Sequence, residues 1–290
     1  MDAVPLKFVD SVVELFGERT LDNLAPEVRH PLWKDLFYLH QRNRVIYELL
    51  LRKTEDSIKL VFVEPNDEPG RAVNVQEIRK NRRFARIVDV VDRSSLCLFE
   101  RVPRNQMTND GTSVLLTSLF RRTYLDRIVL TYRQIAYDFL EDQINNSVFL
   151  SIVLLRGHNW PKSSFDHIKK FCLKGKPGRH VCASVEEADA VDNSYIESFF
   201  DVWKARGILH FWLTFEHHKL DDERLQSLMS QGEVSEKRPN CRESFFKHET
   251  EKSIARIKKN RCFRMECYTC ECDRFERCML KEWCPSHHDF

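Results

Sequence analysis

The chain has 290 residues, of which 42% are hydrophobic and 31% charged, and its net charge is +2. This length allows a substantial core in one large or two smaller domains, and the near-neutral charge gives no general reason to expect nucleic acid or membrane partners. No run approaches the roughly 20 apolar residues of a membrane span. The N-terminus has no basic region typical of a signal peptide, so we expect a cytoplasmic or nuclear protein, not secreted, with reduced cysteines.

The first 43 residues are predicted to form a small helical segment. Apolar residues at i, i+4 spacing predict a helix over residues 4–16, ended by Gly17. Shorter helical stretches follow at 20–28 and at 31–40, and Pro31 suits the first turn of the latter.

A region of strands and short helices is expected next. Residues 44–52 and 57–64 predict a β-hairpin, and the acidic, Pro- and Gly-containing stretch 65–70 predicts a linker. A short helix at 75–80, strands at 84–91 and 96–102, an exposed loop at 103–111 and a helix at 113–120 complete this region.

The main body of the fold is predicted over residues 125–229, where strand and helix patterns alternate. The strands are expected at 126–132, 149–155, 180–185 and 209–215, and the helices at 133–144, 163–173, 194–206 and 221–229. A strand plus a crossover helix is how parallel strands are connected. The sequence therefore predicts an α/β fold, either an open parallel sheet or a leucine-rich-repeat-like array. Within the third unit, Ser194 with Glu197 predicts a capping box and Gly207 a C-terminal cap.

The last 60 residues change in composition. Residues 230–242 are polar and predict a surface loop, 248–259 a charged helix, 261–272 a strand and 273–283 a final helix, with the last three residues loose. We expect three parts: a helical segment at 1–43, an α/β domain at 44–240 and a Cys-rich, basic segment at 241–290.

Motifs of the common enzyme classes are missing from the sequence. There is no GxGxxG after a strand, no GxxxxGK[ST] loop, no GxSxG elbow and no HExxH. His217 and His218 follow the fourth predicted strand, and His210 lies within it. They could form a metal or acid–base site at the strand end, or they could be ordinary loop and core histidines. We assign no catalytic residue, no cofactor-binding residue and no metal ligand, and we expect a protein that is not an enzyme.

Cysteines gather in the C-terminal part, at positions 241, 262, 267, 270, 272, 278 and 284. Cys267-x2-Cys270 and Cys284-x2-His287 have the spacing of two zinc knuckles, and reduced thiols suit that ion. A strand would instead point Cys267 and Cys270 to opposite faces, which leaves buried or surface thiols and redox chemistry as alternatives. Basic residues at 252–264 beside a zinc knuckle could bind nucleic acid, although interspersed glutamates are also typical of a solvated face.

The N-terminal 40 residues resemble a divergent F-box. The residues that carry this resemblance are Val4-Pro5 at the start, the apolar helix through Val12, Val13 and Phe16, then Leu21, Leu24 and Trp33. The runs LRGHNWP (155–161) and NSYIESFFDVWKARGILHFWLTF (193–215) resemble the F-box-associated proteins of nematodes.

This resemblance implies a substrate-receptor subunit of a cullin-based (SCF-type) ubiquitin ligase, acting by protein binding without catalysis. The helical segment would dock on the ligase's linker subunit through Val4, Pro5, Leu21, Leu24 and Trp33, and the α/β region would bind an unknown target protein. The alternatives are that these residues pack on the chain itself, and that the Cys-rich segment makes the protein a zinc-stabilised binding module.

Overall fold

The structure is a computed structural model, and it describes residues 4–53, 58–65, 71–94, 124–188, 191–218, 220–238 and 241–289. The chain divides into two compact units, Met1–Asp126 and Arg127–Phe290. Both contain helices and strands, so the chain is a mixed α/β protein, as the sequence predicts. The predicted strand at 96–102, loop at 103–111 and helix at 113–120 lie outside the described residues.

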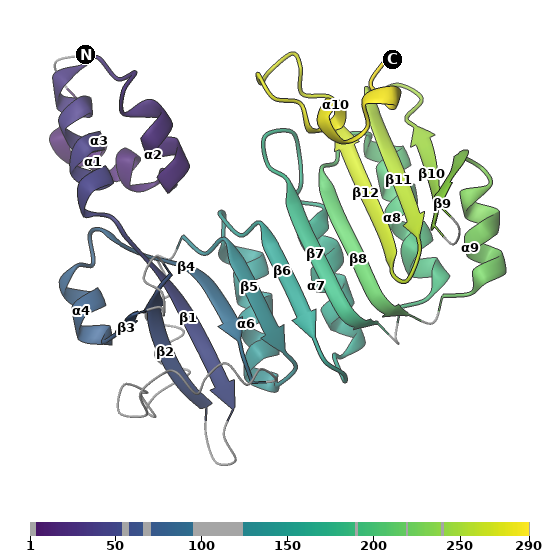
Figure 1. Cartoon of the computed structure of the whole chain (residues 1–290), viewed down its shortest axis with the longest axis horizontal. Coiled ribbons are helices and arrows are strands. Elements are labelled where there is room, and N and C mark those ends of the chain that lie inside the picture. Colours follow the sequence, from purple (N-terminus) through teal and green to yellow (C-terminus); the bar gives the residue numbers. More distant parts are fainter. Residues whose placement is uncertain are drawn as a thin grey trace. The chain divides into compact units, whose positions relative to one another are not determined.

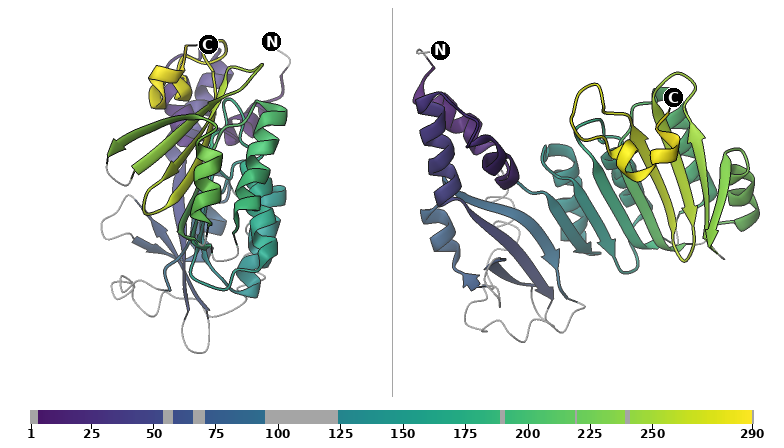
Figure 2. Two further views of the ribbon diagram at one scale, coloured as in Figure 1. Left: turned by 90° about the vertical axis from the view of Figure 1, so that its right-hand side faces the viewer. Right: turned by 45° about the horizontal axis from the view of Figure 1, so that its top comes forward.

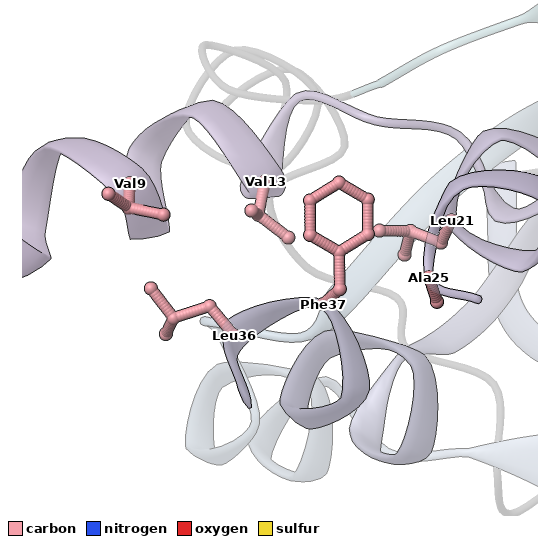
Figure 3. Close-up of a cluster of buried hydrophobic side chains, with 6 residues drawn as sticks. All are labelled: Val9, Val13, Leu21, Ala25, Leu36 and Phe37. Atoms are coloured by element: carbon pink, nitrogen blue, oxygen red, sulfur yellow. The ribbon is translucent and has the colours of Figure 1, made fainter. Parts of the chain in front are cut away.

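The first unit begins with helices α1 (Leu6–Glu14), α2 (Glu18–Leu24) and α3 (Pro31–Asn43), which confirm the predicted helical stretches. The prediction that Gly17 ends the first helix is wrong: α1 stops at Glu14 with Leu15 as its C-cap, and Gly17 is the N-cap of α2. The three helices share a hydrophobic cluster of their own (Figure 3), made of Val9, Val13, Leu21, Ala25, Leu36 and Phe37. Burying these side chains holds together helices that are too short to be stable alone.

The sheet of the first unit has the strand order β3-β2-β1-β4. β1 (Val45–Lys53) and β2 (Ile58–Glu64) form the predicted antiparallel hairpin, β3 (Arg71–Val73) adds to β2, and β4 (Ala85–Asp92) runs parallel to β1. Helix α4 (Val75–Lys80) precedes β4 as predicted. The side chain of Asp10 links α1 to α3 and to the turn before β4, since it lies 2.8 Å from His40 Nε2 and accepts a hydrogen bond from Arg83 Nη2 at 2.7 Å.

The predicted strand–helix units form the first half of the second unit (Figure 1). In chain order they are β5 (Arg127–Thr131), α6 (Gln134–Asn146), β6 (Ile152–Arg156), α7 (Lys162–Cys172), β7 (Val181–Ala188), α8 (Asn193–Arg206), β8 (Phe211–His218) and α9 (Asp222–Met229). Strands β5, β6, β7 and β8 are parallel and adjacent in sequence order. Because crossovers of one hand along an unreversed strand order place their helices on the same side, these helices cover one face of the sheet (Figure 2, left). We call the opposite face the open face.

The caps of α8 differ in part from the prediction. Gly207 ends the helix with φ of 63°, and its N–H donates to Trp203 O at 2.8 Å, which confirms the predicted C-cap. The capping box is wrong: the N-cap is Asp192, whose carboxylate accepts from Tyr195 N at 3.0 Å and from the Ser194 hydroxyl at 2.5 Å. Asp192 serves better because its charged oxygen accepts both bonds at the positive end of the helix.

The second half of this unit is antiparallel and continues the sheet from β8 in the order β12-β11-β10-β9. The strands are β9 (Glu233–Arg238), β10 (Cys241–Lys247), β11 (Ser253–Lys259) and β12 (Phe263–Thr269). The loop predicted at 230–242 and the charged helix predicted at 248–259 are therefore wrong, while the strand predicted at 261–272 is present as β12. The predicted division after residue 240 falls between two paired strands, and that after residue 43 falls inside the first unit.

Residues 270–289, the C-terminal segment, leave β12 and lie on the open face at the upper end of β12 and β11 (Figure 1). Only the last part of the helix predicted at 273–283 forms, as α10 (Met279–Trp283), followed by the 3₁₀ helix η4 (Pro285–His287). The segment has a core of its own against the sheet, in which Leu280, fully buried, packs with Phe245, Ile254 and Tyr268. The Trp283 ring meets Trp212 of β8 edge-on at 5.2 Å between centroids. Among the described residues, no helix is long and apolar enough to cross a membrane.

Candidate metal centre

Four soft donor groups converge at the start, middle and end of the C-terminal segment. They belong to Cys270, Cys272, Cys278 and His288, and their donor atoms all lie within 4.8 Å of one another. His288 Nε2 is 3.4 Å from Cys270 Sγ and 3.2 Å from Cys272 Sγ. A tetrahedral zinc ion with bonds of about 2.0–2.3 Å would place its ligands about 3.5–3.8 Å apart, so the arrangement is close to the size of such a site.

The local backbone explains why these residues meet. Cys270 directly follows β12, and Cys272 begins the turn two residues later, where the thiols of both residues lie beside His288 Nε2. The carbonyl of Glu271 accepts hydrogen bonds from the N–H groups of Arg274 and Phe275, both at 2.9 Å, which turns the chain back. Cys278, the N-cap of α10, lies beside the two cysteines after this turn. His288, the C-cap of η4, completes the group.

The electrostatics of the thiols differ within the cluster. Burial raises the pKa of Cys278, but hydrogen bonds from the backbone N–H groups of Glu271 and Lys281, together with the neighbouring thiols, outweigh burial and place this pKa below its usual value. Desolvation and contacts with the other two thiols raise the pKa of Cys272 to about 11. A divalent cation at the centre would reverse that shift, because metal coordination deprotonates thiols outright.

The zinc knuckles suggested by the sequence do not form. Cys267 is buried in β12 beneath the helices, with its pKa raised well above the usual value by burial. Cys284 is also buried, and its Sγ accepts a hydrogen bond from Arg256 Nη1 at 3.2 Å. The His287 ring stacks on Phe245 at 3.8 Å. Of the predicted set only Cys270 belongs to the cluster.

Sequence reasoning missed Cys272, Cys278 and His288 as members of one site. The usable signal was the Cys-x-Cys pair at the end of a predicted strand, since i, i+2 spacing puts both thiols on one side. His288 also fell in the stretch expected to be loose, although it is half-buried.

The other sequence candidates have different surroundings. The ring of His210 is fully buried, 3.3 Å from Glu271 Oε1, and burial lowers its pKa, so it is a core histidine. The side chains of His217 and His218 lie outside the described residues. The basic stretch at 252–264 is mostly strand, and Arg256, Lys258 and Arg264 all lie within 4.0 Å of the buried Glu266 carboxylate. Cations paired in this way are less available to phosphates.

The residues predicted to bind a ligase linker lie in the helical part of the first unit. Leu21 is buried in the shared cluster, and Val4, Leu24 and Trp33 are half-buried against it, whereas Pro5 is exposed as the N-cap of α1. Phe8 and Leu15 are 56% and 51% exposed. Sequence reasoning did not include either among the residues that bind the linker, although Phe8 belongs to the apolar face predicted for the first helix. Leu15 is the C-cap of α1, and its separation of seven residues from Phe8, about two helical turns, puts both side chains on one side of the helix.

Comparisons with protein-family models, with curated proteins and with solved structures found no match for this chain. The resemblance to F-box-associated proteins stays a prediction.

Proposed function

We propose that the chain is a non-enzymatic binding protein in which a structural zinc ion fastens the C-terminal segment onto the open face of the sheet. The observation that supports this best is the convergence of three thiols and one imidazole within 4.8 Å. Thiolates and imidazole are the ligands that zinc prefers, and a Cys₃His set fills its tetrahedral shell. A filled shell leaves no position for a substrate, which favours a structural role over a catalytic one.

The connectivity of the ligands suits such a fastener. Cys270 directly follows β12, Cys278 precedes α10 and His288 lies near the end of the segment. A shared ion would close the whole segment into a loop anchored on the sheet. The small core around Leu280 would then be held from both sides, because neither end of the segment could separate from the sheet alone.

Metal content tests the proposal, with the protein purified without added metal. We expect one zinc per chain in the wild type and a loss of that zinc in Cys272→Ser and Cys278→Ser. The matched control is Cys284→Ser, which changes a buried thiol of the same segment that contacts Arg256 and lies outside the cluster. A folded wild-type protein without metal would contradict the proposal. Retention of zinc by Cys278→Ser with loss in Cys284→Ser would instead favour the knuckle spacing seen in the sequence.

A second candidate function, docking on the linker subunit of a cullin-based ubiquitin ligase, is favoured by the surface of α1. The helices of the first unit bury a hydrophobic cluster of their own, yet Phe8 in α1 and Leu15 at its C-cap remain exposed on one side of the helix. Exposed large apolar side chains on a small helical module are suited to packing against a protein partner. In this proposal the second unit would present its loops to a target protein.

Co-elution of the chain with the linker subunit on a sizing column tests the docking. We expect a complex with the wild type that is lost in the double variant Phe8→Glu/Leu15→Glu, and weakened when Val4 and Pro5 are replaced by aspartate. Leu6→Glu is the matched control, because Leu6 is 57% exposed on a different side of the same helix. Separate elution of the wild-type chain and the linker would refute this candidate and leave the zinc proposal untouched.

A further inference from the structure

Glu271 lies between two residues of the candidate metal centre, and its side chain points away from them. It is nearly buried, at 5% exposure, although it belongs to a loop. A carboxylate is costly to bury unless its oxygens accept hydrogen bonds. Its surroundings therefore need an explanation beyond the turn in which it lies.

Both carboxylate oxygens of Glu271 have backbone donors on separate parts of the chain. Oε1 accepts from Gly178 N at 2.7 Å, in the turn before β7, and lies 3.3 Å from Nδ1 of the buried His210. Oε2 accepts from Met279 N at 3.3 Å, directly after Cys278. The side chain thus links the cysteine pair, the residue that follows the third cysteine, and the sheet.

The backbone of Glu271 contacts the centre as well. Its N–H donates to Cys278 Sγ at 3.3 Å, and its carbonyl receives the two N–H groups that form the turn. An N–H bond to a metal-bound thiolate orients the sulfur lone pairs and stabilises its charge. The backbone of Glu271 therefore shapes the loop and contacts Cys278, while its carboxylate joins the turn before β7 to the start of α10.

The geometry points to Glu271 as the residue that positions the metal centre, holding the Cys278 thiol within 4.8 Å of the other three donor atoms. This inference rests on the proposed zinc site and adds to it the determinant of its affinity. Glutamine has nearly the same shape, but its amide has one oxygen, so it cannot accept from both Gly178 N and Met279 N. In Glu271→Gln the side-chain NH₂ group would face either Gly178 N–H or Met279 N–H, and the hydrogen bond to that N–H would be lost.

The experiment measures zinc affinity by competition with a chromophoric chelator for the full-length wild type and for Glu271→Gln. Loss of a group that orients a metal ligand typically weakens binding roughly 10- to 100-fold, and we expect a decrease in this range. The spectrum of the Co²⁺-substituted protein is the second readout, because ligand-field bands report the geometry of the ligands. We expect these bands to shift or weaken in Glu271→Gln.

Two control variants separate positioning from simple stability. Asp273→Asn changes an 84% exposed carboxylate in the same loop and should leave affinity and spectrum unchanged. Leu280→Ala removes core packing from the same segment and should lower the melting temperature while the Co²⁺ spectrum stays that of the wild type. Equal zinc affinity and equal spectra in Glu271→Gln and the wild type would overturn the inference alone. A wild type that binds neither Zn²⁺ nor Co²⁺ would overturn the proposed zinc site and this inference together.

Discussion

Removing the metal should destabilise the second unit by an amount set by the loop that the ion closes. The ligands run from Cys270 to His288, a loop of about 19 residues, and the chain-entropy relation for a cross-link of that size gives about 3 kcal/mol. For a unit of the size of residues 127–290, this corresponds to a decrease of about 6–12 °C in melting temperature. This value treats the ion as a cross-link that lowers the chain entropy of the unfolded state, and it assumes that the sheet itself is unchanged when the metal is removed.

The assay is thermal unfolding with and without excess EDTA, combined with hydrogen exchange of the folded state. We expect the lower melting temperature in EDTA to be accompanied by faster exchange in residues 270–289, while the amides of β5 to β8 stay protected. Cys278→Ser should show the lower value in both buffers, which controls for direct effects of the chelator. Equal melting temperatures and equal exchange of the C-terminal segment with and without EDTA would refute the reasoning, because the loop would then be closed by packing alone.

Further predictions concern the packing of the second unit. Leu280→Ala should lower the free energy of unfolding by about 2–5 kcal/mol, because a fully buried leucine is truncated, and urea unfolding that shows under 1 kcal/mol would contradict the packing described. Gly178→Ala should lower the free energy of unfolding by about 1–2 kcal/mol in the same assay, since φ is +78° and a Cβ would lie 2.6 Å from the Phe275 ring. An unchanged urea midpoint would show that Phe275 of the C-terminal segment does not contact this turn. Burial, and then the nearby His210, lower the pKa of His180 to about 4, below its unfolded value. As the pH falls, His180 becomes protonated below about pH 6.5 in the unfolded chain but only near pH 4 in the folded chain. The free energy of unfolding therefore decreases between about pH 6.5 and pH 4, by about 2–3 kcal/mol after allowance for partial exposure. His180→Phe should flatten this dependence relative to the wild type in denaturant titrations at several pH values, and identical slopes would refute the assignment.

The strand–helix units could be predicted because their pattern is local. In β7 the residues Val181, Ala183 and Val185 are buried beneath helices while Cys182 and Ser184 face the open side, so each strand carries its own periodic signal. Helix α8 carries a similar local signal at its end, where Gly207 adopts the left-handed conformation that glycine allows.

The antiparallel half could not be predicted because its charged side chains are buried against partners that are distant in the sequence. Arg256 in β11 looks like part of a solvated helix, yet it is 6% exposed and its guanidinium lies 2.8 Å from Glu266 of β12. Strand β9 is at the edge of the sheet and is polar, with Glu233 and Val234 exposed, which is how a surface loop also looks. The metal cluster depends on the same tertiary information, because the turn after Glu271 and the position of η4 decide which histidine meets the thiols.

The order of strands in the second unit has a consequence for synthesis on the ribosome. The strand that directly borders β8 is β12, which is translated after β9, β10 and β11. Until residue 269 has emerged, β8 has an unpaired edge, and the three earlier antiparallel strands have no place on the growing sheet. The parallel half can therefore form as it is translated, whereas the antiparallel half must join it as a preassembled meander in one late step. A premature stop codon anywhere between β8 and the end of β12 would leave that edge open to pairing with other chains, so such truncated products should aggregate and not accumulate as smaller folded proteins.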